Sequence, residues 1–314
     1  VENTFGFSLG GAIKKNKLFF FGTYQADRFR SGTDARVRVP TASGFNTLRS
    51  LFPVGTNPNL DRYLSIVGNL RGEREISSVA LGDGRPNIDF GETTVSSTQP
   101  VNDNQYLARV DWTPTQKDSI AFRYVLDDQA FNNQFPGSSP FPGFEIDVPS
   151  LVQNFYANYT RSFSTRTTNE FRFGYGRFNV QFAPRDPEVG LAGPVFSFTG
   201  AGLGQGITSV GLPTGFPQGR LFNNYQFQDT ISHTAGNHTL RFGADLNVQR
   251  STQDIPFNSR GILIFAGGGG FNSFGNFVDQ FSGRGGGGAA IQFGSPTIFP
   301  NAFYQNYFIN DTWR

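Results

Sequence analysis

The sequence predicts an all-β fold, an antiparallel sheet assembled from successive hairpins. Aromatic residues make up 15% of the 314 residues, and charged residues only 16%, against about 25% in ordinary soluble domains. Apolar segments recur in pairs that are joined by short polar turns. Within these segments large apolar and polar side chains alternate with a period of two, which is typical of strands.

The predicted hairpins follow one another along the whole chain. Four pairs of apolar segments are each closed by a turn rich in Lys, Thr, Asn or Gly, and one further segment near the C-terminus is unpaired. The sequence therefore predicts about nine strands. They cover residues 5–9, 18–24, 105–112, 119–126, 152–163, 169–182, 224–232, 239–248 and 303–313, with turns at 14–17, 113–118, 164–167 and 234–238.

Each predicted strand has one apolar face and one polar face. In residues 119–126, Ile120, Phe122 and Tyr124 lie on one face and Arg123 lies on the other. The apolar parity of residues 169–182 shifts between Tyr175 and Phe178, and we interpret the shift as a β-bulge near Arg177. The polar faces carry Arg109, Asp111, Arg123, Glu170, Arg172, Arg241 and Asp245.

Four long connections separate the hairpins. All four lie at the same end of the strands, opposite to the short turns. Connections of more than about 12–15 residues are uncommon in compact soluble domains. The sequence of the first connection predicts helical turns, because apolar residues recur there at helical spacing. These residues are Leu48, Leu51 and Phe52, and then Leu60, Tyr63, Leu64 and Val67. The last is of low complexity at Gly267–Gly270 and Gly285–Gly288. The four connections cover about residues 27–104, 127–151, 184–222 and 250–302.

This arrangement favours strands that cross a bilayer. Transmembrane strands need about 9–11 residues, alternate apolar and polar side chains, and join through short turns on one side and long loops on the other. Trp112, Phe163 and Trp313 lie at strand ends near the turns, where an interfacial aromatic girdle is expected. Asp229 and Asp311 share parity with apolar neighbours, but a charge close to the interface costs little. The sequence therefore predicts a transmembrane β-barrel of the outer-membrane type.

A soluble β-sandwich also alternates, because it buries one face of each sheet. The strand lengths, the number of large aromatic side chains and the consistent asymmetry of the loops argue against it. A helical membrane protein is excluded because a spanning helix needs about 18 consecutive apolar residues, whereas apolar runs such as Leu18-Phe19-Phe20-Phe21 reach only four or five residues here.

Several segments resemble a known family. The run from Phe5 to Tyr24, FGFSLGGAIKKNKLFFFGTY, is similar to an early barrel hairpin of Oar-like TonB-dependent outer-membrane receptors. Val39-Pro40-Thr41-Ala42 matches the V-P-T-A that commonly follows in that family. Residues 108–114 and 310–314 resemble its recurring hairpin edges. The resemblance covers strands along the whole chain and leaves the long loops unmatched.

The resemblance implies a barrel of about 22 strands that is plugged by an N-terminal domain and energised through a TonB box. No Met occurs in the chain, so we expect a fragment of a longer protein. Residues 1–314 are then one partial barrel domain without a plug domain, which forms an open, curved sheet. The implied partners are outer-membrane lipid, the protein's own plug domain and TonB through missing N-terminal segments, and an unknown extracellular ligand.

No chemistry of catalysis or cofactor binding is predicted. The chain has no Cys, which excludes thiolate metal sites and cysteine nucleophiles. His233 and His238 have no carboxylate close by in sequence, so we expect polar roles at the turn rather than a metal site. The run 200–206 and Gly267–Gly270 lack the spacing of phosphate-binding loops. The net charge of +2 gives no concentrated basic surface for nucleic acid.

The sequence leaves three functions open. The first is substrate uptake by a TonB-dependent receptor of the outer membrane. The second is an outer-membrane porin or surface adhesin without a plug, and the third is a soluble carbohydrate-binding β-sandwich. The loops contain Phe131, Phe135, Phe141 and Phe144, which we expect to pack the loop rather than to contact ligand; the substrate and its contact residues are unknown.

Overall fold

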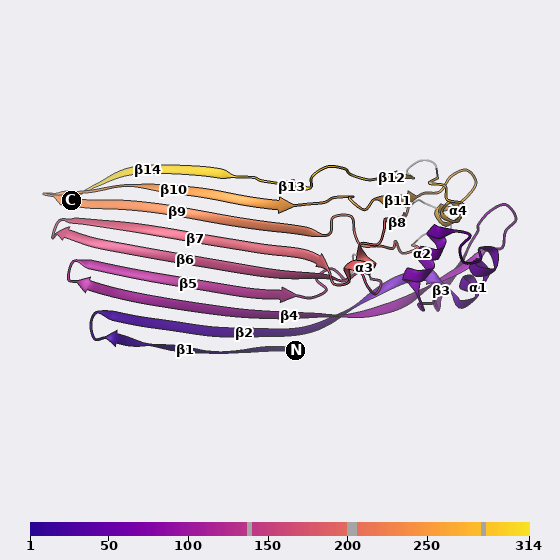
Figure 1. Cartoon of the computed structure of the whole chain (residues 1–314), viewed down its shortest axis with the longest axis horizontal. Helices are drawn as coiled ribbons and strands as arrows, with labels where there is room; N and C mark the ends of the chain where they lie inside the picture. The colour runs from indigo at the N-terminus through magenta and orange to yellow at the C-terminus, as the bar shows by residue number, and fades with distance from the viewer. Residues whose placement is uncertain (137–139, 200–205, 284–286) are drawn as a thin grey trace.

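The computed structural model describes residues 1–136, 140–199, 206–283 and 287–314, and its main feature is one antiparallel sheet of long strands (Figure 1). Residues 200–205 of the glycine run 200–206, and Gly285 with Gly286, lie outside this description. The long strands are β1 (Glu2–Lys14), β2 (Leu18–Pro40), β4 (Ile88–Thr115), β5 (Asp118–Phe131), β6 (Ile146–Ser164), β7 (Thr167–Pro184), β9 (Gln218–Ala235), β10 (His238–Asp254) and β14 (Ala302–Trp313).

These nine strands and their hairpin order confirm the prediction. Strands adjacent in sequence are adjacent in the sheet, and β14 pairs with β10. In the described part of the chain β1 pairs only with β2, so the sheet is open, with β1 and β14 along its two edges. The short turns lie at one end of the sheet and the long connections at the other (Figure 1).

The strands are longer than predicted, and the long connections are correspondingly shorter. β4 has 28 residues and β2 has 23, whereas about 9–11 residues are enough to cross a bilayer. The extra length lies in polar stretches, such as residues 93–99, which lack the aromatic alternation. Backbone pairing with a neighbouring strand therefore continues beyond the segments that the aromatic pattern marks.

The predicted bulge near Arg177 is wrong. The register of β7 is unbroken from Asn169 to Val180 against β6 and along its whole pairing with β9. Phe178 therefore lies on the same face as Gly174 and Gly176, opposite to Phe173. The apolar parity changes because the inner-face residues that follow Phe178, Val180 and Phe182, pack into the hydrophobic core, while the backbone pattern does not change.

The long connections contain helices and short strands, which gather at one end of the sheet (Figure 1). Both predicted helical segments are helices, and each begins with a side-chain cap, from Thr41 to the Gly44 amide and from Asn57 to the Leu60 amide. The elements are α1 (Ala42–Leu51), α2 (Pro58–Val67), α3 (Pro187–Gly190), α4 (Ser273–Val278), β3 (Arg74–Val79), β8 (Val195–Phe198), β11 (Ile262–Phe265), β12 (Gly288–Ala290) and β13 (Thr297–Ile298).

We call residues 41–87, 185–199, 206–217 and 255–283 the cap. It contains most of the hydrophobic core, in which Tyr63, Phe196, Phe274 and Phe277 are fully buried. β8, β11 and β12 form a separate three-stranded sheet in which β8 and β11 are parallel. The helix α4 and the strand β11 arise within the connection predicted only as low complexity.

Candidate functional site

The outer face of the sheet is a band of aromatic and aliphatic side chains. Large apolar residues on this face remain exposed, for example Phe122, Phe171 and Phe242. Their rings contact one another across strands, as between Phe155 and Phe173 at 6.2 Å and between Phe173 and Phe227 at 5.1 Å between ring centroids. A continuous exposed apolar band across nine strands requires an apolar surrounding medium.

The end of this band near the short turns carries the predicted aromatic residues. Trp112 is 43% exposed and Trp313 is 75% exposed, and Phe163 is also exposed. Asp311 accepts a hydrogen bond from, or pairs with, the His238 Nδ1 at 2.7 Å. Asp229 accepts one from the Asn169 amide at 2.7 Å. The two carboxylates that break the apolar pattern are therefore partnered at the turn end of the sheet.

A second aromatic row, which the sequence pattern had not suggested, crosses the other border of the band. Tyr24 and Tyr106 contact each other at 4.9 Å between ring centroids, and Tyr175 and Tyr225 do so at 5.0 Å. Their hydroxyls point to polar neighbours, as where Tyr24 donates to Asn104 at 3.1 Å. Six residues separate Tyr106 from Trp112, and eight separate Tyr225 from His233, which spans roughly 20–26 Å along a strand. This matches the apolar band of about 25 Å in outer-membrane barrels.

The inner face carries the polar residues that the alternation predicts. Arg109 pairs with Asp111 at 2.8 Å, and Arg172 pairs with Glu170 at 2.8 Å. Arg123 lies over the ring of Tyr156 at 4.7 Å. Further along the wall, Asp245 accepts hydrogen bonds from Gln226 and Gln228. These charged groups are locally neutralised, as is expected of a surface that faces water, and Phe19 and Phe21 of β2 lie on the same face.

The two histidines occupy separate places. His233 Nδ1 lies 2.8 Å from the hydroxyl of Thr167 on β7, whereas His238 interacts with Asp311 on β14 and stacks on Trp313. Among the described residues, no group of three or more His, Asp or Glu side chains is placed to hold a metal ion. The histidines act as polar partners near the turns, where the sequence places them.

The cap folds over the inner face at the end of the sheet that is remote from the turns. Val148 and Val180, on the inner face of β6 and β7, belong to the same core as the cap. Phe182 packs against Phe135 and Phe216 at 6.1 and 6.0 Å between ring centroids. Phe141 and Phe144 are almost fully buried. The loop phenylalanines therefore pack the loop, as expected. The cap covers the end of the inner face that is remote from the turns.

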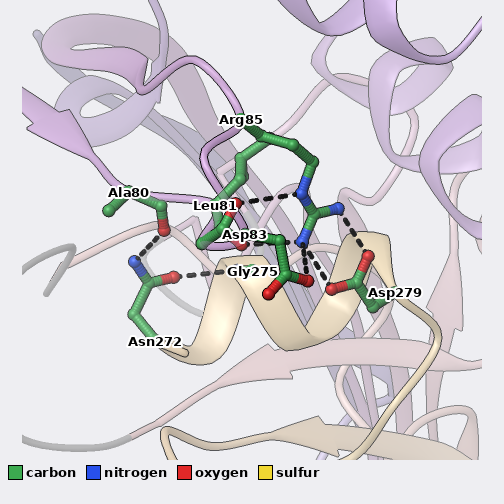
Figure 2. Close-up of polar contacts among 8 residues, drawn as sticks. Ala80, Leu81, Asp83, Arg85, Asn272, Gly275 and Asp279 are labelled. Atoms are coloured by element: carbon green, nitrogen blue, oxygen red, sulfur yellow. Dashed lines mark hydrogen bonds and ion pairs between the residues drawn. The ribbon is translucent and has the colours of Figure 1, made fainter. Parts of the chain in front are cut away.

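One polar clasp joins the first and the last connection within the cap (Figure 2). The Arg85 guanidinium donates to both carboxylate oxygens of Asp279 at 2.6 and 2.7 Å and to the carbonyl of Leu81 at 2.8 Å. Asn272, which caps α4, donates to the carbonyl of Ala80 at 2.6 Å. Because 194 residues separate Arg85 from Asp279, this contact links segments from opposite edges of the sheet.

Burial and pairing shift the pKa values of several groups in the cap. A hydrogen bond from Arg49 holds the pKa of Asp61 below its usual range, and the backbone amide of Gly55 adds to this effect. Burial alone raises the pKa of Tyr63 and lowers the pKa of Arg62. The Tyr63 hydroxyl has no hydrogen-bond partner in the described part of the chain. These groups lie apart within the cap and do not converge on a reactive centre.

A family comparison covers the whole chain. Residues 1–314 match the family described as the outer membrane beta barrel domain. The chain belongs to this family. The exposed apolar band of this outer membrane beta barrel domain therefore faces lipid, and the protein lies in an outer membrane of the Gram-negative type. None of its described helices is long and apolar enough to cross a membrane.

Solved structures are similar to this outer membrane beta barrel domain at low sequence identity. The outer membrane transporter YddB from Escherichia coli aligns over 100% of this chain and 32% of its own, at 10% identity and a TM-score of 0.53. This likeness supports the fold. The ferric-catecholate import receptor Fiu from E. coli K12 aligns over 98% of this chain and 44% of its own, with 10% identity and a TM-score of 0.41.

A Pseudomonas aeruginosa FadL homologue aligns over 99% of this chain and 67% of its own, at 7% identity and a TM-score of 0.27. No curated protein matches the sequence. The barrel domain described here thus spans about a third of the length of YddB. The membership in an outer-membrane family removes the soluble β-sandwich from the functions left open by the sequence.

Proposed function

We propose that the chain forms part of the barrel of a TonB-dependent receptor that takes up a substrate across the outer membrane. The Oar-like first hairpin, residues 5–24, supports this assignment over a porin. The partners are outer-membrane lipid, a plug domain inside the barrel, TonB, and an extracellular ligand of unknown identity. The chain acts in transport, and we assign it no enzymatic step.

The observation that carries the proposal is the cap over the polar wall. A passive porin needs a permanently open aqueous path, whereas here the loops share a buried core with Val148 and Val180 on the inner face of the sheet. Opening such a path requires the cap or the contents of the barrel to move. A receptor that is energised from the inner membrane supplies the work for such a movement, and a porin does not.

Electrical conductance of the full-length protein in planar lipid bilayers tests the proposal. A plugged receptor is expected to show no steady open pore, and a stable ohmic conductance of porin size would overturn the assignment. A pull-down with the periplasmic domain of TonB gives the second measurement. Binding that is lost when the N-terminal TonB box is deleted is expected, and an open reading frame that leads from a signal peptide directly into strands would contradict it.

A further inference from the structure

The inner wall contains a hollow where two glycines interrupt the row of side chains on β7. Gly174 and Gly176 both face inward, so side chains of β6 and β9 rise on either side of a floor that has none. The resulting cavity has a volume of about 270 Å³, and a second cavity of about 230 Å³ adjoins it at Tyr156, Gly174 and Gln226. Together they reach the size of ordinary small-molecule sites, about 300–1,000 Å³.

Amide side chains with unused hydrogen-bonding capacity surround this floor. Asn154 and Asn224 line the first cavity, and their side chains make no hydrogen bond within the described residues. The amide oxygen of Asn154 lies over Gly176, at 3.2 Å from the place that a Cβ would occupy. Asn158 lines the second cavity, and its Oδ1 is buried without a partner in the described chain. Buried polar atoms without partners are rare, and each calls for a missing partner such as water or a ligand.

Aromatic rings form the rest of the walls. Tyr156, Phe178 and Phe222 line the first cavity, and Phe178 stacks on Phe222 at 6.2 Å between ring centroids. Tyr156 and Phe178 remain partly exposed on the inner face, next to these amides. Exposed rings next to free amides offer one ligand both an apolar surface and hydrogen bonds.

The cavities present no free charge. No carboxylate lines either of them, and Arg172 of the second cavity is bound to Glu170 through two hydrogen bonds of 3.0 and 2.8 Å. Arg177 borders the first cavity, but it alternates with Gly176 and its side chain belongs to the outer parity of β7. Arg123 is stacked on the ring of Tyr156. An anionic ligand would find no unengaged cation here, so a neutral ligand fits better.

The hollow lies directly below the cap. Phe178 and Phe222 are paired with each other in the sheet, and the next inward residue of β7, Val180, already belongs to the core that includes the cap. A ligand that passes the cap therefore meets this part of the wall first. The two adjoining cavities also suit an extended ligand with repeated units.

From this arrangement we infer that the Gly174–Gly176 hollow of the inner wall binds a neutral oligosaccharide. Sugar hydroxyls both donate and accept, as the free amides of Asn154, Asn158 and Asn224 require. The apolar C–H faces of sugar rings pack against Phe178 and against the part of the Tyr156 ring that Arg123 leaves exposed. The inference rests on the proposed uptake function for its biological role, because it names the substrate class of that route.

Isothermal titration calorimetry on the full-length protein in detergent tests the inference without any transport step. The probes are maltohexaose, cellohexaose and fully N-acetylated chitohexaose, with N-acetyl-hexaalanine amide as an uncharged peptide of comparable length. At least one hexasaccharide is expected to bind and the peptide is not. Absence of binding to all three sugars, or preference for the peptide, would overturn the proposal.

Gly174→Leu is the decisive variant. A Cβ at Gly174 meets nothing closer than 3.6 Å, so the strand accepts a side chain that projects into the space where the two cavities meet. The matched control is Gly22→Leu, because a Cβ there also has its nearest neighbour at 3.6 Å but points to the lipid-facing side. We expect Gly174→Leu to weaken sugar binding at least about tenfold and Gly22→Leu to change it less than about twofold.

Asn154→Ala removes one free amide and leaves the backbone unchanged, so it provides a second measure if Gly174→Leu fails to assemble. Its binding is also expected to weaken, by roughly tenfold. Equal affinity in wild type and Asn154→Ala would exclude this amide, and with it the inferred site. Sugar binding together with a porin-like conductance would instead leave the site intact and overturn the proposed uptake by a plugged receptor.

Discussion

Single side chains decide how the cap is held together, and Arg85 is the clearest case. Its side chain is 21% exposed and that of Asp279 is 34% exposed, so water screens the pair only in part. The same guanidinium also binds the carbonyl of Leu81, and Asp279 follows the last turn of α4. One side chain therefore ties the first connection to the last.

Replacement of Arg85 by Met is expected to loosen the cap without disturbing the sheet. The loss of charge-assisted hydrogen bonds at a partly exposed site should lower the local stability by about 1–2 kcal/mol. Hydrogen exchange should accelerate in residues 272–281 and 80–85, and not in β5 to β7. High salt should reduce the difference between wild type and variant, since the pair is screened.

Arg49→Met serves as the matched control, because Arg49 pairs with Asp61 within the cap but joins only α1 to α2. It should accelerate exchange in residues 42–67 and leave residues 272–281 unchanged. Equal acceleration of both regions in both variants would contradict the role assigned to Arg85.

Among the elements, the short helix α4 is central to the core of the cap. It has six residues, and its Phe274 and Phe277 are fully buried against Tyr63 of α2 and Phe198 of β8. Such a short helix has little stability of its own, so the cap core and the Asn272 cap maintain it. The cap in turn loses its central aromatic cluster without α4.

Phe277→Ala should therefore destabilise the cap by at least about 3 kcal/mol, the usual cost of a large buried cavity. Limited proteolysis is expected to cleave within residues 255–283 while the hairpins stay intact. Phe293→Ala is the control, because Phe293 is 83% exposed and its loss should change stability by less than about 0.5 kcal/mol. Similar proteolysis of the two variants would refute the core role of α4.

Each long strand has a lipid-facing side and an inner side. Substitutions at two neighbouring residues of one strand distinguish these sides. Phe122 lies on the lipid-facing side of β5, and Ala121 lies on the inner side opposite Asn158. Phe122→Arg should cost about 2–4 kcal/mol in folding into lipid vesicles, because a charge is placed in hydrocarbon. Ala121→Arg should fold almost as wild type does, since its side chain reaches the polar wall.

Urea titration of the full-length protein in lipid vesicles measures both variants. If Ala121→Arg were the more damaging change, the assignment of inner and outer faces would be reversed, and with it the location of the glycine hollow.

At the scale of the whole molecule, the sheet crosses the membrane, so its two ends lie on opposite sides of the bilayer. The short turns lie at one end and the cap at the other (Figure 1). Since outer-membrane barrels carry short turns on the periplasmic side and long loops outside the cell, we expect the cap to face the exterior.

The absence of cysteine from the sequence makes this orientation simple to measure with single-cysteine variants of the full-length protein. Val54→Cys, at an exposed site of the cap, should react with a membrane-impermeant maleimide on intact cells. Lys15→Cys, in the first short turn, should react only after the outer membrane is permeabilised. The opposite result would invert the orientation, and reaction of both on intact cells would contradict a sealed barrier.

The sequence alone determined the sheet, because each strand alternates side chains with a period of two and the hairpin turns are local. It therefore predicted nine strands, their order, the inner arginines and the aromatic residues near the turns. The alternation of apolar and polar residues does not show whether a face contacts lipid, water or protein. The change of parity at Phe178 was therefore wrongly interpreted as a bulge. Only the tertiary structure revealed that the inner face becomes part of the hydrophobic core beyond Phe178, at Val180 and Phe182.

The site also depended on contacts that no local pattern encodes. The glycine floor at Gly174 and Gly176 becomes a cavity because the register aligns it with Asn154 on β6 and Asn224 on β9. Likewise, Arg85 meets Asp279 only because the connections at both edges fold toward each other. Sequence fixes which residues alternate, since that depends on neighbours along the chain. Tertiary structure decides which distant residues share a surface, because that depends on register between strands and on how the loops pack.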